Sequence, residues 1–251
     1  MAGLRGAGDI FFSVLDSGSY SGYLSLANIA SFVIGNSGSE TKSIKSTSPA
    51  NPGAIIGSST MPGDDTIKIT LNVPNRENLL LMTLGEGSTI SDAASSIINE
   101  VVTVRSKNSH VVLNHQKLDP GVAPVVTNTA GTTTYTEGSD YVVDYVNGML
   151  YITPSSLIAV GSIHVDYSWL ALSGYSIQAR RKPSAIGKLL FTGMNLDSGE
   201  NIRLTADSVE LSPDGDFNLI SSDGEFLEFS LTGLMKVPPG QLSPYVLKVV
   251  A

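Results

Sequence analysis

The sequence predicts a mainly β protein, on two observations. Short segments in which Val, Ile and Thr alternate with polar residues are bounded by Gly, Asn, Asp and Pro, the usual pattern of strands joined by turns. Hydrophobic residues make up 41% of the chain and charged residues only 15%, and 25 glycines supply many turns. The 251 residues are enough for one large β domain or for two smaller ones.

The N-terminal region is predicted to begin with a strand pair and to continue as a long polar segment. Residues 9–16 form the first expected strand, and Ser17-Gly18-Ser19 is a turn that leads to a second strand at residues 23–34. Residues 35–65 are rich in Ser, Thr, Gly and Pro with scattered apolar positions, so we expect a long inter-strand loop or arm. Loops of more than about 12 to 15 residues tend to be functional or disordered, and a mobile surface loop is the alternative.

An alternating strand and a short helix follow. Residues 66–73 place aliphatic side chains on one face and polar side chains on the other, which predicts a half-buried strand. Pro74 ends this strand, Asn75 is a good N-cap, and the Leu-rich residues 76–84 predict one short helix packed on a sheet. Gly85 suits the C-terminal cap of that helix.

The rest of the chain is predicted to be largely extended. Residues 93–100 are compatible with a helical turn or two, whereas residues 101–104 and 110–113 have the pattern of strands. Asn147-Gly148 lies between two apolar segments and is the strongest short hairpin signal. Further strands are expected at residues 141–146, 149–152, 162–169, 175–179, 188–195, 202–211, 226–231 and 245–250.

Breaks near residues 85–87 and 173–174 predict a discontinuous domain. Residues 1–87 and 174–251 would form one β domain that carries the loop or arm at 35–65. Residues 88–173 would then be a β-rich middle segment or inserted subdomain.

No set of residues typical of an enzyme is found in the sequence. There is no cysteine, and His110 and His115 are an odd number of positions apart, so one strand would point them to opposite faces. His164 and Asp166 share a strand face, but an exposed polar pair explains them. Residues 85–89, which are rich in glycine, lack the lysine of a phosphate loop, so a turn is expected. We predict a protein that is not an enzyme and has no catalytic residue, metal or cofactor.

The excess negative charge lies in one stretch. Residues 192–230 contain nine acids and one base, Arg203, whereas the remaining 14 acids and 14 bases balance. A surface of this sign repels DNA phosphates, and a groove that binds nucleic acid needs the opposite sign. The N-terminal 15 residues are too short and polar for a secretory signal, and no run reaches the roughly 18 apolar residues of a membrane helix. The chain is therefore expected to be soluble and not exported, with no membrane partner.

The order of these elements resembles the major tail proteins of long-tailed (siphovirus) bacteriophages. The resemblance consists of an early strand pair that opens with Gly8-Asp9-Ile10, a long polar loop, an alternating strand and a Leu-rich helix. Residues 132–169 add a segment with the Gly-x-Asp-Tyr pattern, here Gly138-Ser139-Asp140-Tyr141, followed by a glycine turn and a strand with aromatic residues. The resemblance covers most of the chain, and the combination is more specific than any single motif.

This resemblance implies a β-sandwich or partial barrel of the phage tail tube type. Six copies would close into a ring, and rings would stack into a tube through which DNA is ejected without specific binding. The implied partners are further copies of the chain and the tail tip, tape measure and tail terminator proteins, in the virion and, during assembly, in the host cytoplasm. The candidate inter-subunit loop residues are Lys42, Ile44, Lys45, Ile55, Ile56 and Met61. The candidate acids of the channel wall are Asp214, Asp216, Asp223, Glu225 and Glu228.

Three alternatives remain open at the level of sequence. The tube of a contractile tail or of a type VI secretion system shares the ring architecture. A surface-decorating immunoglobulin-like binding module would stay monomeric and bind a glycan or a host cell. An enzyme would need a cluster of titratable residues in one pocket.

Overall fold

The computed structural model describes residues 5–216, 218–220 and 228–250, and it confirms the prediction of a mainly β protein. Strands account for 56% of the described residues and helix for 3%. The chain divides into two compact units: unit 1 comprises Met1–Gly87 and Ile177–Ala251, and unit 2 comprises Ser88–Ser176. The middle segment outlined from the sequence begins at the same residue as unit 2 and ends at residue 173 rather than 176.

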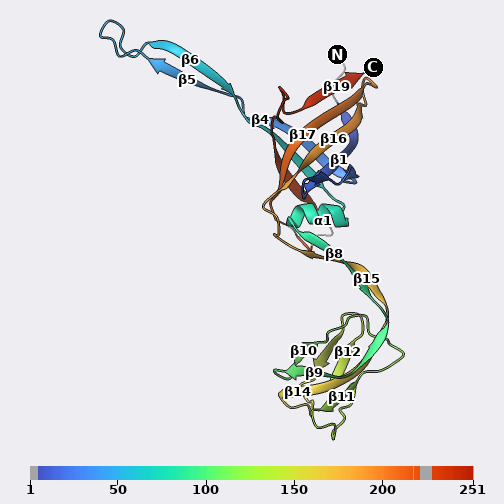
Figure 1. The fold of residues 1–251 in the computed structure, drawn as a ribbon. Helices are drawn as coiled ribbons and strands as arrows, with labels where there is room; N and C mark the ends of the chain where they lie inside the picture. Colours follow the sequence, from blue (N-terminus) through green and yellow to red (C-terminus); the bar gives the residue numbers. More distant parts are fainter. Residues whose placement is uncertain (1–4, 217, 221–227, 251) are drawn as a thin grey trace. The chain divides into compact units, whose positions relative to one another are not determined.

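Unit 1 is built around one antiparallel sheet (Figure 1). In the described residues this sheet has nine strands, of which seven follow one another in hydrogen-bonded order. The order is β2 (Ser19–Tyr20), β1 (Gly6–Asp16), β16 (Ala185–Asn195), β17 (Asn201–Asp214), β18 (Phe229–Met235), β7 (Asp65–Leu71) and β4 (Ile29–Asn36), with β3 (Leu24–Ser25) beside β1 and β19 (Val246–Val250) beside β17. Strands from both ends of the sequence therefore share one sheet.

The core of unit 1 lies on one face of this sheet. On β7, Ile67, Ile69 and Leu71 are buried while Lys68 and Thr70 lie on the opposite face, which confirms the predicted half-buried strand. The buried apolar side chains of unit 1 are Ile10, Phe12, Leu26, Ile67, Ile69, Leu71, Leu81, Met82, Ala185, Leu189, Leu204, Ala206, Val209, Leu211, Phe229, Leu231 and Met235. Most of them come from alternate positions of the long strands, so the sheet supplies most of its own core.

The sheet curls so that two of its parts face each other across this core. Phe32 of β4 stacks on Phe191 of β16 with ring centroids 5.5 Å apart, although β17, β18 and β7 lie between these strands in the sheet. Contact between strands so far apart in the order requires strong twist and curvature. This is the mainly β sandwich or partial barrel that was predicted.

The first hairpin is shorter than predicted. Ser17 and Gly18 have φ angles of 49° and 82°, which form the two-residue turn that suits the twist of a hairpin. The second strand predicted at residues 23–34 is wrong as a single element, because it is divided into β3 and β4. Ala27, with φ 61°, lies in the interruption, and a left-handed residue cannot continue an extended strand.

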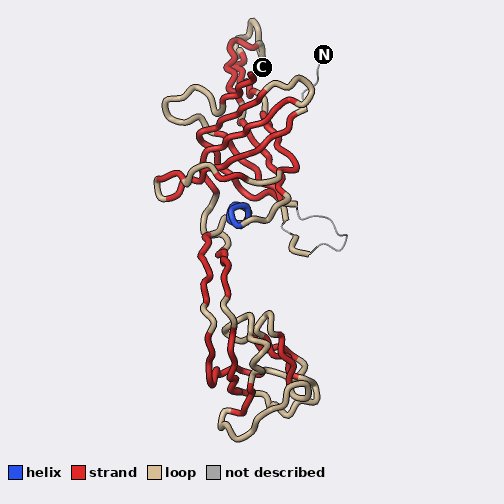
Figure 2. The backbone as a smooth tube through the Cα atoms, turned by 90° about the vertical axis from the view of Figure 1, so that its right-hand side faces the viewer, coloured by secondary structure: helices blue, strands red, loops and turns tan. Residues whose placement is uncertain are grey.

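The predicted helix is confirmed as α1 (Arg76–Thr83), the only helix in the described part of the chain (Figure 2). The Asn75 side chain caps it by accepting a 2.8 Å hydrogen bond from the backbone of the first turn. The left-handed residue at the C-terminal end is Leu84 rather than Gly85. Gly85 is required for a different reason, because a Cβ there would lie 2.5 Å from Ile177 Cγ2.

Two strands of unit 1 lie outside the large sheet. β5 (Ser39–Lys45) and β6 (Ile55–Pro62) pair with each other as an antiparallel hairpin between β4 and β7 in the chain (Figure 1). The prediction of a loop at residues 35–65 is therefore wrong in its local structure, and the alternative of an arm describes it. We use "the arm" for residues 39–62. It forms strands without burial because its Ser, Thr and Ile residues suit a paired, extended backbone.

The chain leaves unit 1 through β8 (Glu86–Asp92) and returns through β15 (Leu172–Gln178). These two strands pair with each other as a two-stranded ribbon. The turn predicted at residues 85–89 is wrong, since the strand β8 begins at Glu86. Neither glycine of that segment has a positive φ, so the sequence Gly-Glu-Gly does not mark a turn here.

Unit 2 is a small β-sandwich with its own core. Its two three-stranded sheets, within the described residues, have the orders β10-β13-β12 and β11-β14-β9. The bounds are β9 (Ser95–Val104), β10 (Ser109–Val112), β11 (Val125–Asn128), β12 (Tyr141–Asp144), β13 (Met149–Ile152) and β14 (Gly161–Trp169). The helical alternative at residues 93–100 is wrong, because β9 pairs there with β14. The Asn-Gly hairpin is confirmed, with residues 145–148 forming its loop.

Candidate assembly interface

The arm continues the ladder between β4 and β7. That ladder ends at the pair Asn36 and Asp65, whose side chains form a 2.9 Å hydrogen bond. Ser37 Oγ accepts a hydrogen bond from Asp64 N at 2.6 Å, and Gly38 N donates to Asn36 Oδ1 at 2.7 Å. The β5–β6 ladder begins directly beyond these bonds. These hydrogen bonds therefore connect the arm to the end of the β4–β7 ladder.

All six residues predicted to contact a neighbouring subunit lie on the arm. They are Lys42, Ile44 and Lys45 on β5 and Ile55, Ile56 and Met61 on β6. The apolar ones are largely in solvent: Ile44, Ile55, Ile56 and Met61 are 67%, 66%, 64% and 53% exposed. Four large apolar side chains on one narrow hairpin form an unusual exposed group, which is typical of a surface that another molecule covers.

The register distributes these side chains over both faces of the arm. Ile44 lies opposite Gly57 and shares its face with Met61, whereas Ile55 is paired with Lys45 on the other face. A Cβ at Gly57 would lie 3.9 Å from Ile44 Cδ1, so the Ile44 side chain is near the glycine. Either face of the arm can therefore meet an apolar surface.

Polar residues close the tip of the arm. Ser46 Oγ donates to Asn51 Oδ1 at 3.0 Å and accepts from Ser48 N at 3.1 Å. The Ser46 carbonyl accepts a 2.9 Å hydrogen bond from Gly53 N, and Gly53 has a φ of 80° that favours glycine. The tip is therefore formed by residues of the arm itself, and the apolar side chains are left for contacts outside it.

The predicted channel acids have different environments. Asp214 ends β17, and its Oδ2 atom lies 2.7 Å from Lys68 Nζ. Asp216 and Glu228 are exposed and lie between β17 and β18 in the chain. Asp223 and Glu225 lie outside the described residues. Which of these acids line a channel stays a prediction.

Lysines from outside the acidic stretch neutralise part of its charge. Three acids of β17 each have one: the pairs are Lys68 with Asp214, Lys188 with Asp207, and Lys236 with Glu210. The hydrogen bond from Lys236 holds the pKa of Glu210 below its ordinary value, and the hydrogen bond to Asp207 raises the pKa of Lys188. These pairs are partly exposed, so each stabilises the fold by no more than about 1 kcal/mol. Their main effect is on the surface charge, which becomes a mixture of positive and negative groups in place of negative groups alone.

Part of the face of β7, β17 and β18 that points away from the core is polar. Its two cross-strand rows are Ser212, Thr232 and Lys68, and Asp214, Ser230 and Thr70. Thr70 Oγ1 and Ser230 Oγ lie 3.2 Å apart within hydrogen-bonding distance. We use "the polar face" for these six residues. It presents hydroxyl groups and one ion pair, which gives a hydrated surface without an excess of cations.

The family described as "Protein of unknown function UCP028589" has a model that matches residues 4–237. The chain belongs to this family. No curated protein matches the sequence. The matched residues include the arm, the polar face and all of unit 2.

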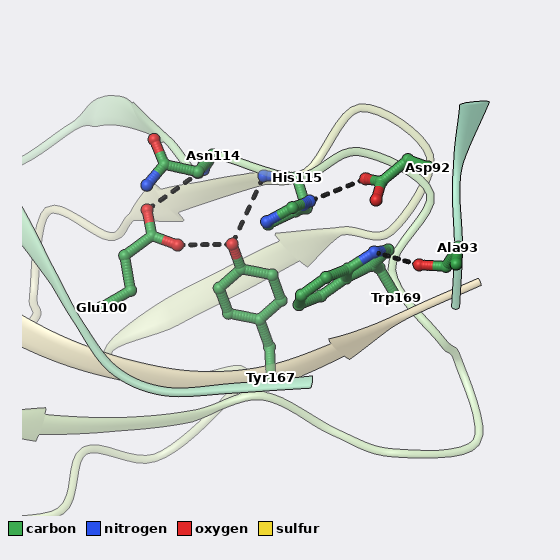
Figure 3. Close-up of polar contacts among 7 residues, drawn as sticks. All are labelled: Asp92, Ala93, Glu100, Asn114, His115, Tyr167 and Trp169. Carbon is green, nitrogen blue, oxygen red and sulfur yellow. Dashed lines mark hydrogen bonds and ion pairs between the residues drawn. The ribbon is translucent and has the colours of Figure 1, made fainter. Parts of the chain in front are cut away.

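In this UCP028589 member, His115 lies in a network of side chains in unit 2 (Figure 3). Its ring stacks on Trp169 with centroids 3.6 Å apart, and its Nδ1 atom lies 2.8 Å from Asp92 Oδ2. Trp169 Nε1 donates to the Ala93 carbonyl at 2.9 Å. Asp92 and Ala93 begin the chain's path into unit 2 and Trp169 ends β14, so these contacts hold entry and exit together. His110 lies on β10 and His164 on β14, so the histidines do not form one site.

Glu100 and Tyr167 form the buried part of the same network. The Glu100 carboxylate accepts hydrogen bonds from Tyr167 Oη and from Asn114 N, the latter at 3.0 Å (Figure 3). Burial and the Glu100 carboxylate together raise the pKa of the Tyr167 phenol. Sequence reasoning missed this pair because the two residues are far apart in the chain. Their full set of hydrogen bonds explains why a carboxylate can be buried here.

The Gly-x-Asp-Tyr motif has a structural role in unit 2. Gly138 has a φ of 83°, and the buried Asp140 carboxylate accepts hydrogen bonds from Thr136 N at 2.9 Å and Leu157 N at 2.6 Å. These bonds hold the pKa of Asp140 below its usual value. Tyr141 Oη donates to a backbone carbonyl, and burial raises its pKa to about 12. The motif therefore fastens loops together.

The remaining candidates also have structural partners. His164 and Asp166 share the outward face of β14, and Asp166 Oδ1 accepts a 2.6 Å hydrogen bond from Asn99 N at the bulge of β9. Two basic residues that were not among the candidates, Arg181 and Lys182, pair with Glu86 and Asp16. Among the described residues, no three His, Asp or Glu side chains are grouped so that they could hold a metal ion. Within those same ranges, no helix has the length and apolar character needed to cross a membrane.

Proposed function

We propose that this protein is the structural subunit of a phage tail tube, which assembles as stacked hexameric rings that form a conduit for DNA ejection. The main observation that supports this proposal is the arm. It is a formed hairpin whose four large apolar side chains are exposed, and nothing else in the described chain pairs with its strands. A segment of this kind gains stability only when a partner covers it.

The large sheet supports the same function. Contacts between different surfaces of identical subunits generate rings and open stacks, whereas a contact between identical surfaces ends at a dimer. The arm and the sheet are different surfaces of one chain, so a contact between them repeats. The polar face suits the wall of the conduit, because hydroxyl groups and neutralised acids do not retain DNA.

The other members of such an assembly follow from the family resemblance. Copies of the chain are the main partner, and the tail tip, tape measure and tail terminator proteins meet the ends and the interior of the tube. The assembled protein belongs to the virion, and its subunits are stored in the host cytoplasm before assembly. This role uses no cofactor and no catalytic residue. A tube with a contractile sheath has the same ring, and a sheath gene beside this one would favour it.

Electron microscopy of the purified full chain tests this proposal. We expect rings or tubes of uniform diameter at high protein concentration, and six-fold symmetry in end-on averages. Sedimentation velocity over a concentration series should show growth from monomers to long polymers. A monomer at every concentration and salt level would contradict the proposal and favour a surface-decorating binding module.

A further inference from the structure

Unit 1 has an apolar groove beside two free strand edges. The groove has a volume of about 470 Å³ and is lined by residues of β1, β4, β16, β17 and β19, none of which is charged. Its lining includes Ile29, Phe32, Ile34, Phe191, Leu247 and Val249. We use "the edge groove" for this site. It is too apolar to bind a polar metabolite through hydrogen bonds.

The edge groove is a strip of the core that the fold leaves uncovered. Leu247 and Val249 lie opposite Leu204 and Ile202 of β17, so they point to the core face, yet they are 53% and 54% exposed. Ile34 lies opposite the buried Ile67 and is 38% exposed. Side chains on the core face are normally covered. Their exposure at both margins shows that unit 1 by itself does not complete its core.

The backbone at both margins is also open. Among the described strands, β4 pairs only with β7, and β19 pairs only with β17. The outer edge of each strand therefore presents N–H and C=O groups to solvent, and an added strand can pair with them. An extended segment with apolar side chains would therefore fit this site.

We propose that the edge groove of one copy receives the arm of another copy. The arm is extended, has apolar side chains on both faces, and has free strand edges of its own. Its ladder follows that of β4 and β7, and its strands pair with no described strand of the large sheet. The contact joins two different surfaces, so each copy can give one arm and receive one. This inference rests on the proposed function and specifies the surface that its subunit contact uses.

A second cavity of unit 1 fits the arm less well. It has a volume of about 300 Å³ and lies between α1 and β1, with two ion pairs among its lining residues. The pairs are Asp16 with Lys182 and Arg76 with Glu77. An isoleucine inserted there would remove water from these charges, which is costly unless new partners replace it. The edge groove has no such charges.

Disulfide crosslinking in the full chain tests this contact, because the natural sequence has no cysteine. Ile55→Cys is placed on the arm of one preparation and Val249→Cys in the groove of a second, affinity-tagged preparation. A disulfide requires the two Cα atoms to come within about 7 Å, so a mixed dimer reports contact between copies. We expect the mixed dimer to form in assembled tubes and not in dilute monomer.

The matched control replaces Val249→Cys by Leu24→Cys, which lines the second cavity and is 43% exposed. We expect no crosslink from Ile55→Cys to this position. Two results in assembled tubes would overturn the inference and leave the proposed function intact. One is a crosslink from Ile55→Cys and Ile56→Cys to Leu24→Cys. The other is no crosslink from either arm variant to any of Ile34→Cys, Leu247→Cys and Val249→Cys. Failure of the unmodified chain to form any polymer would overturn both.

A charge in the groove gives an independent measurement. Val249→Lys should raise the protein concentration needed for assembly by about tenfold or more, since a buried cation has no partner there. Ile186→Lys is the matched control, because Ile186 is 44% exposed and lies on the outward face opposite Glu210. It should change that concentration by less than about twofold. Equal effects of both variants, with unchanged unfolding temperatures, would contradict the groove assignment.

Discussion

The inward side chains of edge strands are exposed to different degrees in the two units. In unit 2, the inward residues Val104, Val111 and Val126 lie on edge strands and are 0%, 6% and 0% exposed. In unit 1, the corresponding residues Ile34 and Val249 are 38% and 54% exposed. A sheet edge alone therefore does not force exposure. Unit 2 covers its core within 89 residues, whereas unit 1, with more strands, leaves part of its core face exposed.

Removing one feature from each unit should have opposite results, and this is the largest effect that we expect. Deleting residues 39–62 joins Gly38 to Gly63, which are adjacent because the Gly38 carbonyl oxygen lies 1.9 Å from the Cβ position of residue 63. The β4–β7 hairpin then keeps a four-residue loop, so unit 1 should fold. We expect assembly to weaken by more than about a hundredfold. Sedimentation velocity and electron microscopy measure this.

The matched deletion removes residues 93–171 and joins β8 to β15 by Asn-Gly, which suits a two-residue hairpin. Because unit 2 has its own core, we expect the shortened protein to form tubes of the same repeat. We expect assembly to need the arm of unit 1 and not to need unit 2. Loss of tubes when residues 93–171 are deleted, or survival of tubes without the arm, would contradict this.

The same substitution in both units tests the comparison at the level of one side chain. Leu150 is fully buried in unit 2, and Leu150→Ala should destabilise that unit by about 2 to 5 kcal/mol. Leu247 is 53% exposed, so Leu247→Ala should lower the stability of the monomer by less than about 1 kcal/mol. Urea unfolding of dilute monomer measures both. A large loss from Leu247→Ala in the monomer would show that the edge groove is already covered.

The Asp140 carboxylate gives unit 2 a pH dependence. Asp140→Ala should cost about 1.5 to 3 kcal/mol, because it removes three hydrogen bonds to a charged acceptor and leaves two backbone N–H groups unpaired. The folded pKa of Asp140 lies below its unfolded value, so its contribution is present above about pH 4 and is lost as the pH falls through the folded pKa. Unfolding of wild type and variant between pH 2 and 7 should show curves that converge only in acid. A constant difference down to pH 2 would contradict this.

The strands were predictable where one face of the chain is buried. The alternation of residues 66–73 and the Asn-Gly hairpin are local signals, and the structure confirms both. The arm was harder to predict, because Ser and Thr in a paired strand without burial give the same composition as a loop. Residues 95–100 form a strand because β14 pairs with them, a tertiary effect that outweighs the local pattern.

The candidate interface was predictable only in part. The six candidate residues all lie on β5 and β6, and their contact with another subunit stays a prediction. The edge groove was not found, since Ile34 and Val249 read as ordinary core positions and their exposure depends on which strands are missing beside them. The negative charge that residues 192–230 present to solvent was overestimated. Lys68, Lys188 and Lys236, which come from other parts of the sequence, form ion pairs with three of its acids.

The smallest effect on stability is expected at Asp214 of the polar face and at the two described acids between β17 and β18, where the readout is DNA binding. Asp214, Asp216 and Glu228 are partly or fully exposed, so replacing all three by Lys should change the stability of the monomer by no more than about 1 kcal/mol. Tubes should still form, since these positions lie away from the arm and the edge groove. Short double-stranded DNA mixed in before assembly should then be retained by the variant tubes and not by wild type. Retention should fall steeply with salt, because each phosphate contact releases counterions.

Nuclease treatment separates the two possible locations of the bound DNA. DNA inside the conduit is protected from digestion, whereas DNA on the outside is degraded. Salt-sensitive, nuclease-resistant retention would place the polar face on the channel wall, and retention that nuclease removes would place it on the outer surface.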